Sequence, residues 1–150
     1  MRVRKVAVVI AAASALVLAG CSSDSGDTAA DSGTAAADTS NADIKICMVT
    51  HGDGGGFCPV AKAGAVKAGE DLGVTFDYQE SNNDAEAQAQ LIEADVSGGC
   101  DAIAVSAPNP DAIKDAMAKA EAAGIPLVTM NSGSQVFKEL GAFTHVGQDE

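Results

Sequence analysis

Short apolar runs in this chain are each followed by side chains that form hydrogen bonds. Hydroxyl, amide and carboxylate groups suit a polyhydroxylated ligand, because they match the donors and acceptors of its hydroxyl groups. In any single loop, the same residue types are also expected as turn and capping residues, as at Asn109 before a helical pattern. The side chains are Thr50, His51 and Asp53 after the first run, Gln79, Glu80, Ser81, Asn82 and Asn83 after the second, Ser106 and Asn109 after the third, Asn131 and Ser132 after the fourth, and Gln148 and Asp149 after the fifth.

His51 and Asp53 also raise the question of acid–base chemistry or metal binding. Either role needs a nucleophile or a third ligand, and the pattern identifies neither. His145, the second histidine, lies inside the last apolar run. We therefore expect a hydrogen-bonding loop histidine, and we expect no enzymatic activity, no metal and no cofactor.

The glycines between His51 and Phe57 invite comparison with phosphate-binding loops. The G-x-G-x-x-G motif is not met, because Phe57 stands at its third glycine position counted from Gly52, and no Lys-Ser/Thr pair follows. Glycines here would instead let the backbone bend or approach a ligand closely. Phe57 suits two roles equally, stacking on a sugar ring or covering the core beneath it.

The spacing of the apolar runs predicts the elements that position these side chains. Strands are expected to begin near residues 44, 74, 101 and 126, with a shorter fifth strand at 143–146. Helical patterns lie between the first four, at 59–72 before Gly73, at 84–97, and from Pro110 to Gly124. This alternation predicts a parallel, doubly wound α/β sheet. Ligands bind beyond the carboxyl ends of such strands, so the polar side chains should share one edge.

The first 43 residues differ in kind from the rest. Residues 1–20 have a basic start followed by an apolar stretch of about 13 residues, which is typical of a secretory signal and too short for a membrane span. The sequence Leu-Ala-Gly-Cys ending at Cys21 resembles the lipobox of bacterial lipoproteins, which implies lipidation of Cys21. Residues 21–43 are Ser, Asp, Thr, Ala and Gly in the main, and we expect a disordered tether before a folded part at 44–150.

The charge of the chain excludes one class of function, and its cysteine content predicts a free thiol. Removal of the signal leaves six basic side chains (nine less three) against 21 acidic ones, a formal charge of −15 that argues against nucleic-acid binding. Beyond Cys21 there are three cysteines, Cys47, Cys58 and Cys100, so at least one is a free thiol. A Cys47–Cys100 bridge would form if their strands were neighbours, but we expect buried free thiols.

The order of several motifs resembles the solute-binding lipoproteins of sugar ABC importers, in the ribose/galactose-type class I periplasmic-binding-protein family. The resemblance covers residues 44–150 and rests on these segments: 44–53, Tyr78–Asp84, Ala89–Ile92, Ala104–Ala112, Gly124–Ser132 and Val146–Glu150. It implies a type I fold of two α/β lobes closing on a sugar, of which this chain would hold most of the first lobe, in a truncated form.

The resemblance also implies specific ligand contacts. They would come from Asp53, Phe57 and Cys58 after the first strand, from Ala107 and Asn109 after the third, and from Asn131 and Ser132 after the fourth. The family often has an aromatic residue where Cys58 stands and an Asp-Arg pair where Asn131-Ser132 stands. Without that arginine there is no bidentate clamp on ring hydroxyls, which argues against a ribose-like specificity.

We therefore expect an exported, lipid-anchored solute-binding protein that captures a sugar or polyol and delivers it to ABC permease subunits. We expect a monomer that reaches the membrane through its lipid and binds no nucleic acid. A binding module that feeds a chemoreceptor or kinase is an alternative. A small α/β enzyme fits less well, since neither Gly-x-Ser-x-Gly nor a P-loop occurs.

Overall fold

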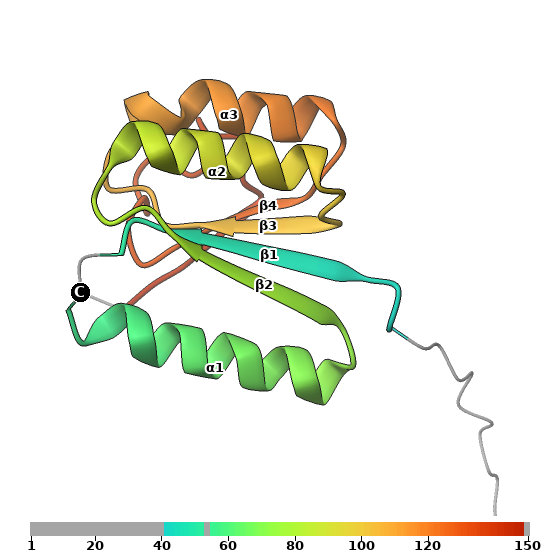
Figure 1. Cartoon of the computed structure of the whole chain (residues 1–150). Helices are drawn as coiled ribbons and strands as arrows, with labels where there is room; N and C mark the ends of the chain where they lie inside the picture. Colours follow the sequence, from blue (N-terminus) through green and yellow to red (C-terminus); the bar gives the residue numbers. More distant parts are fainter. Residues whose placement is uncertain (1–40, 53–54, 149–150) are drawn as a thin grey trace, which may run out of the picture. The chain divides into compact units, whose positions relative to one another are not determined.

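The computed structural model of the chain describes residues 41–52 and 55–148 (Figure 1). The expected signal and tether, with the lipidation site Cys21, lie almost wholly outside these residues, as do the predicted ligand contacts Asp53 and Asp149. Within the described residues, no helix is long and apolar enough to cross a membrane.

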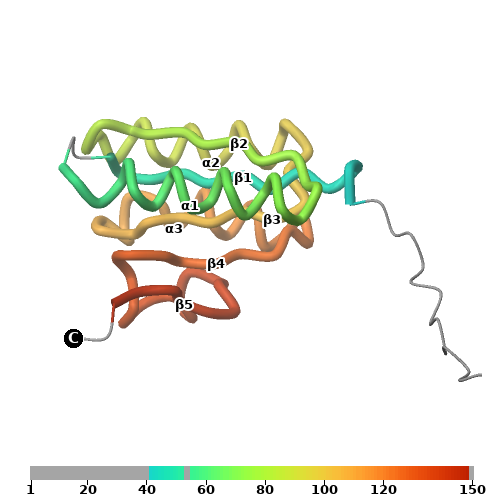
Figure 2. Tube along the Cα trace, turned by 90° about the horizontal axis from the view of Figure 1, so that it is seen from below, coloured from blue at the N-terminus to red at the C-terminus, as the bar shows by residue number. Residues whose placement is uncertain are grey.

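Among the described residues, five parallel strands form one sheet in the order β2-β1-β3-β4-β5 (Figure 2). The predicted α/β fold class is confirmed. The central strands β1, β3 and β4 are mostly apolar, which suits a sheet covered by helices, whereas the edge strand β2 also contains Asp77, Gln79 and Glu80. The strands are β1 (Lys45–Thr50), β2 (Thr75–Glu80), β3 (Ala102–Val105), β4 (Leu127–Met130) and β5 (Thr144–Val146).

In the described part of the chain, three helices cover the sheet: α1 (Phe57–Leu72) on one face, and α2 (Ala85–Ser97) and α3 (Pro110–Ala122) packed side by side on the other (Figure 1). Local signals set several of their ends. The Asp84 side chain accepts a hydrogen bond of 2.9 Å from the Ala87 N–H at the start of α2. Gly73 ends α1 with φ +67°, a conformation that favours glycine.

Two expectations about helix starts are wrong. Helix α1 begins at Phe57, two residues before the expected Pro59. Asn109 occupies the N-cap position of α3, but its side chain makes no capping hydrogen bond. Pro110 itself lacks an N–H, which leaves fewer unpaired donors for such a cap to satisfy.

The main core lies between the sheet and the pair α2 and α3. Ile92, Ile103, Ile113, Met117 and Leu127 are each at least 99% buried. Burial of one such side chain contributes roughly 1.5–3 kcal/mol relative to leaving it exposed, so this cluster is a major source of the stability of the lobe. On the opposite face, the missing side chain of Gly69 lets α1 approach β2, since a Cβ there would lie 2.9 Å from the Phe76 Cβ.

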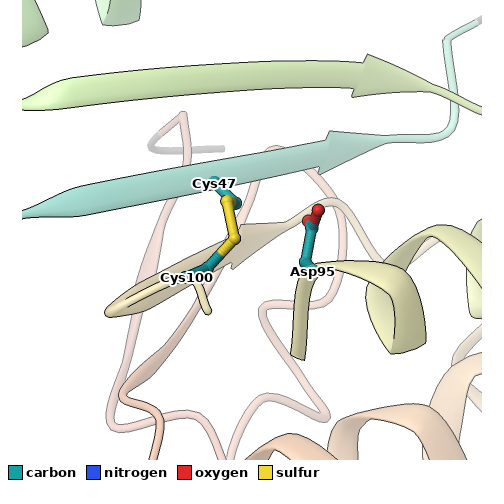
Figure 3. A group of neighbouring side chains, drawn as sticks. All are labelled: Cys47, Asp95 and Cys100. Carbon is teal, nitrogen blue, oxygen red and sulfur yellow. A yellow bond between two sulfur atoms is a disulfide. The ribbon is translucent and has the colours of Figure 1, made fainter. Parts of the chain in front are cut away.

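A disulfide joins Cys47 of β1 to Cys100, which lies just before β3 (Figure 3). The expectation of free thiols is therefore wrong for these two residues, while Cys58 is free and buried. The reason is strand order: β1 and β3 are neighbours, which brings the two Cα atoms to 5.9 Å, within the range of a disulfide.

Candidate binding edge of the sheet

The carboxyl ends of β1, β2 and β3 surround a first cavity of about 190 Å³. It opens beside the N-terminal end of α2, whose first residues contribute to its wall. Two of the predicted site residues, His51 and Asn109, meet here although 58 positions separate them. The lining residues are His51, Ser81, Asn83, Ala85, Gln88, Pro108 and Asn109.

The orientation of His51 in this cavity is set by Ser106, a buried residue at the end of β3. The Ser106 Oγ accepts a hydrogen bond of 2.8 Å from the His51 backbone N–H and lies 2.8 Å from His51 Nδ1. The hydroxyl proton of Ser106 finds an acceptor if it is donated to Nδ1, which then carries no proton. In that tautomer the imidazole presents an Nε2–H donor.

Backbone hydrogen bonds fix the same loop from the other side. The carbonyl of His51 accepts from the Asn83 N–H at 2.6 Å and from the Ser81 hydroxyl at 3.2 Å. The Gln88 side chain, which is 99% buried, donates from Nε2 to the Ser106 carbonyl at 2.7 Å. A wall of the cavity is therefore held in place by several independent hydrogen bonds, so little ordering remains to be done when a ligand binds.

A second cavity, of about 250 Å³, lies at the ends of β4 and β5. Polar side chains line it: Asn131, Ser134, Gln135, His145 and Gln148. His145 Nδ1 hydrogen-bonds to the Thr129 hydroxyl at 2.8 Å, which places the ring at the cavity wall. Asn131 adopts φ +59° and its N–H donates to the Val146 carbonyl, so it also turns the chain sharply after β4.

Next to the first cavity, a chain of hydroxyl groups ties β1 to β2. The Tyr78 hydroxyl donates to Glu80 Oε1 at 2.6 Å and lies 2.9 Å from the Thr50 hydroxyl. Because the only proton of the Tyr78 hydroxyl is given to Glu80, the Thr50 hydroxyl donates to the Tyr78 oxygen. Desolvation, together with the hydrogen bond to Glu80, raises the pKa of Tyr78 to about 12. The Lys62 ammonium stacks on the tyrosine ring, 4.7 Å from its centroid. Tyr78 remains a neutral donor throughout the physiological range.

The remaining predicted site residues within the described part of the chain lie at different places along the binding edge. Phe57, at the first position of α1, is 39% exposed, whereas Cys58 is 3% exposed and lines neither cavity. Ser132 lies between the cavities, where its carbonyl accepts from the Ala107 N–H at 3.0 Å. Gln148 lines the second cavity.

Four of the polar lining residues were not among the side chains expected at this edge: Gln88, Ser134, Gln135 and His145. Gln88 was hidden because it occupies a position on the buried face of α2, where an apolar residue is the usual choice. A buried glutamine in an apolar stripe is a signal that could have found it. His145 was assigned to a strand interior. Ser134 and Gln135 follow Ser132 in a loop whose path the sequence does not specify.

The donors and acceptors of both cavities are mostly neutral amides, hydroxyls and imidazoles. Such groups recognise hydroxyl-bearing molecules through hydrogen bonds. A parallel α/β unit with this lining at the carboxyl edge of its sheet defines a small-molecule binding unit.

Residues 44–150 match the family described as periplasmic binding protein domain, and the chain belongs to this family of binding proteins. The xylitol-binding protein of Mycolicibacterium smegmatis is 31% identical over 123 residues, which cover 82% of this chain and 32% of that protein.

Solved structures agree with this assignment. A carbohydrate transporter protein from Acidothermus cellulolyticus 11B, in complex with myo-inositol, is 38% identical with a TM-score of 0.67, and the match covers 71% of this chain and 37% of that one. A solute-binding protein from Burkholderia graminis C4D1M, in complex with D-arabinose, is 26% identical with a TM-score of 0.63, covering 70% and 35%. The chain thus spans about a third of the length of the proteins that it matches.

Proposed function

We propose that this chain is part of an extracytoplasmic solute-binding lipoprotein that captures a sugar or polyol for an ABC importer. The observation that carries the proposal is the lining of both cavities by neutral hydrogen-bonding groups, in a member of the periplasmic binding protein family. Proteins similar to this chain bind xylitol, myo-inositol and D-arabinose, all of which carry several hydroxyl groups.

In this proposal the binding edge provides one wall of a cleft. His51, Asn83 and Asn109 contact one end of the ligand from the first cavity, and Asn131 and Gln148 contact the other end from the second. The chain corresponds to about a third of its relatives, so the opposite wall comes from a part of the protein that corresponds to the rest of their length. No bond is made or broken, and closure on the ligand signals the permease.

Isothermal calorimetry on the protein encoded by the whole reading frame tests the ligand class. The panel contains myo-inositol, xylitol, D-arabinose, D-ribose and D-glucose, with a free amino acid as the unrelated solute. We expect at least one polyol or sugar to bind with a micromolar or tighter Kd. If no member of the panel produced heat, the carbohydrate assignment would be abandoned.

Two matched substitutions connect binding to the proposed wall. Asn109→Ala removes one amide from the first cavity and should weaken binding about threefold to tenfold, the equivalent of one hydrogen bond. Gln90→Ala removes an amide of similar kind from the exposed face of α2 and should leave the Kd unchanged. Equal effects of the two substitutions would place the ligand elsewhere.

The lipid anchor and the transport role need separate tests. Substitution of Cys21 by serine should release the protein from the membrane fraction into the medium or periplasm, whereas retention on the membrane would contradict lipidation of Cys21. Deletion of the gene should abolish uptake of the labelled ligand. Unchanged uptake with a lost transcriptional or chemotactic response would favour the sensing alternative.

A further inference from the structure

A buried carboxyl group lies beside the disulfide (Figure 3). Asp95, on α2, is 3% exposed. Its Oδ1 accepts a hydrogen bond of 2.5 Å from Gln79 Nε2, but its Oδ2 is buried and has no hydrogen-bond partner among the described residues. An acceptor left unpaired in this way is costly, so its position calls for an explanation.

The two sulfur atoms of the disulfide are close neighbours of the Asp95 carboxylate. One carboxylate oxygen of Asp95 and the sulfur atoms of Cys47 and Cys100 all lie within 4.8 Å of one another. The backbone also fixes this arrangement, because the Cys100 N–H donates to the Asp95 carbonyl at 3.2 Å. A disulfide sulfur is not a thiolate, so in this bonded state the three residues do not offer a metal two sulfur ligands.

Burial separates this group from solvent. Cys47 has no exposed surface and Cys100 is 3% exposed, whereas the Gly98–Gly99 turn next to Cys100 is exposed. Desolvation raises the pKa of Asp95, and the charge of Asp77 on β2 raises it further, while the Gln79 hydrogen bond and Lys45 on β1 lower it. A raised pKa brings the carboxyl group closer to the pKa of a thiol, which favours proton transfer between the two.

We propose that Asp95 donates and accepts the proton of Cys47 when the Cys47–Cys100 disulfide opens and closes. In reduction, a dithiol reductant enters at the Gly98–Gly99 turn and its thiolate attacks the Cys100 sulfur. The Cys47–Cys100 bond breaks, Cys47 leaves with the electron pair, and the proton of Asp95 converts it to a thiol. The second thiol of the reductant then releases Cys100, so two electrons pass from the dithiol to the protein disulfide.

Closure follows the same path in reverse. An external disulfide forms a mixed disulfide with Cys100, Asp95 removes the proton of Cys47, and the Cys47 thiolate attacks the Cys100 sulfur and expels the external thiolate. Cys47 needs such a partner because it has no exposed surface through which water could exchange its proton. In the reduced state, the thiol would also give the unpaired Oδ2 a hydrogen-bond donor.

The experiment follows reduction of the folded, disulfide-bonded chain by dithiothreitol between pH 5 and pH 8.5. Samples are quenched with an alkylating reagent, and the Cys47 and Cys100 peptides are measured by mass spectrometry. Rates are divided by the thiolate concentration of the reductant. We expect Asp95→Asn to be reduced at least tenfold more slowly than the wild type at pH 6, since general acid catalysis contributes about 10²–10⁴-fold.

Two comparisons separate proton transfer from a structural effect of the substitution. In guanidinium chloride the wild type and Asp95→Asn should be reduced at the same rate, and Glu93→Gln on the same helix should match the wild type when folded. The second readout needs no variant: the corrected rate of the folded wild type should fall as pH rises through the pKa of Asp95. Equal rates for folded wild type and Asp95→Asn, or a wild-type profile parallel to that of the denatured chain, would overturn the proposal.

Discussion

The Cys47–Cys100 disulfide closes a loop between residues 53 positions apart, and its removal has a calculable effect. In the chain-entropy model, a cross-link over about 53 residues lowers the entropy of the unfolded chain by roughly 14 cal/mol/K, which stabilises the fold by about 4 kcal/mol at 25 °C. For a domain of this size, such a change corresponds to a decrease of about 15–30 °C in Tm. Reduction should therefore destabilise the lobe severely.

The assay is urea unfolding with and without tris(2-carboxyethyl)phosphine, followed by far-UV circular dichroism because the chain has no tryptophan. Reduction of the wild type retains both sulfur atoms, so it isolates the cross-link from the packing of the side chains. The variant Cys47→Ala/Cys100→Ala should be insensitive to the reductant. If mass spectrometry confirmed the disulfide but reduction changed the free energy of unfolding by less than about 1 kcal/mol, the entropic reasoning would be refuted.

Three further predictions concern helix packing, the binding edge and the tyrosine. Gly69→Ala should destabilise the chain by about 1–3 kcal/mol through overpacking. Gly64→Ala, which has open space on the same helix, should stabilise it by about 1 kcal/mol. Urea unfolding that changed the free energy of unfolding in the same direction for both variants would contradict this. Ser106→Ala should cost about 1–3 kcal/mol by leaving a backbone N–H unpaired, while Ser97→Ala on the exposed end of α2 should change stability by less than about 0.5 kcal/mol in the same assay. Absorbance at 295 nm should show Tyr78 ionising near pH 12. Stability should be lost as pH rises from about 10, where the side chain of the unfolded state releases its proton. A titration midpoint near pH 10 would exclude the hydrogen bonds that join Thr50, Tyr78 and Glu80.

The sheet and helices could be predicted well because their signals are local. Four of the apolar runs form strands β1 to β4, each of which starts within one residue of its expected position. As expected, Gly73 ends helix α1 and Asp84 caps the start of helix α2. The start of α1 at Phe57 was missed because the glycines before it and Pro59 after it both indicated a later start. The disulfide was missed for a different reason. Whether Cys47 can reach Cys100 depends on which strands are neighbours, and no local pattern states that order.

The division of the binding edge into two cavities, like the disulfide, depends on contacts between distant segments that no local sequence pattern shows. The sequence placed polar side chains after each strand, which predicts one continuous row along the edge. In the structure, the Ala107 N–H donates to the Ser132 carbonyl and joins the loops after β3 and β4 between the two cavities. Gly133 makes this contact possible, because its φ of +108° favours glycine and a Cβ there would lie 2.9 Å from the Ala107 Cβ. A ligand held by both Asn109 and Asn131 would therefore have to lie across this junction between the two loops.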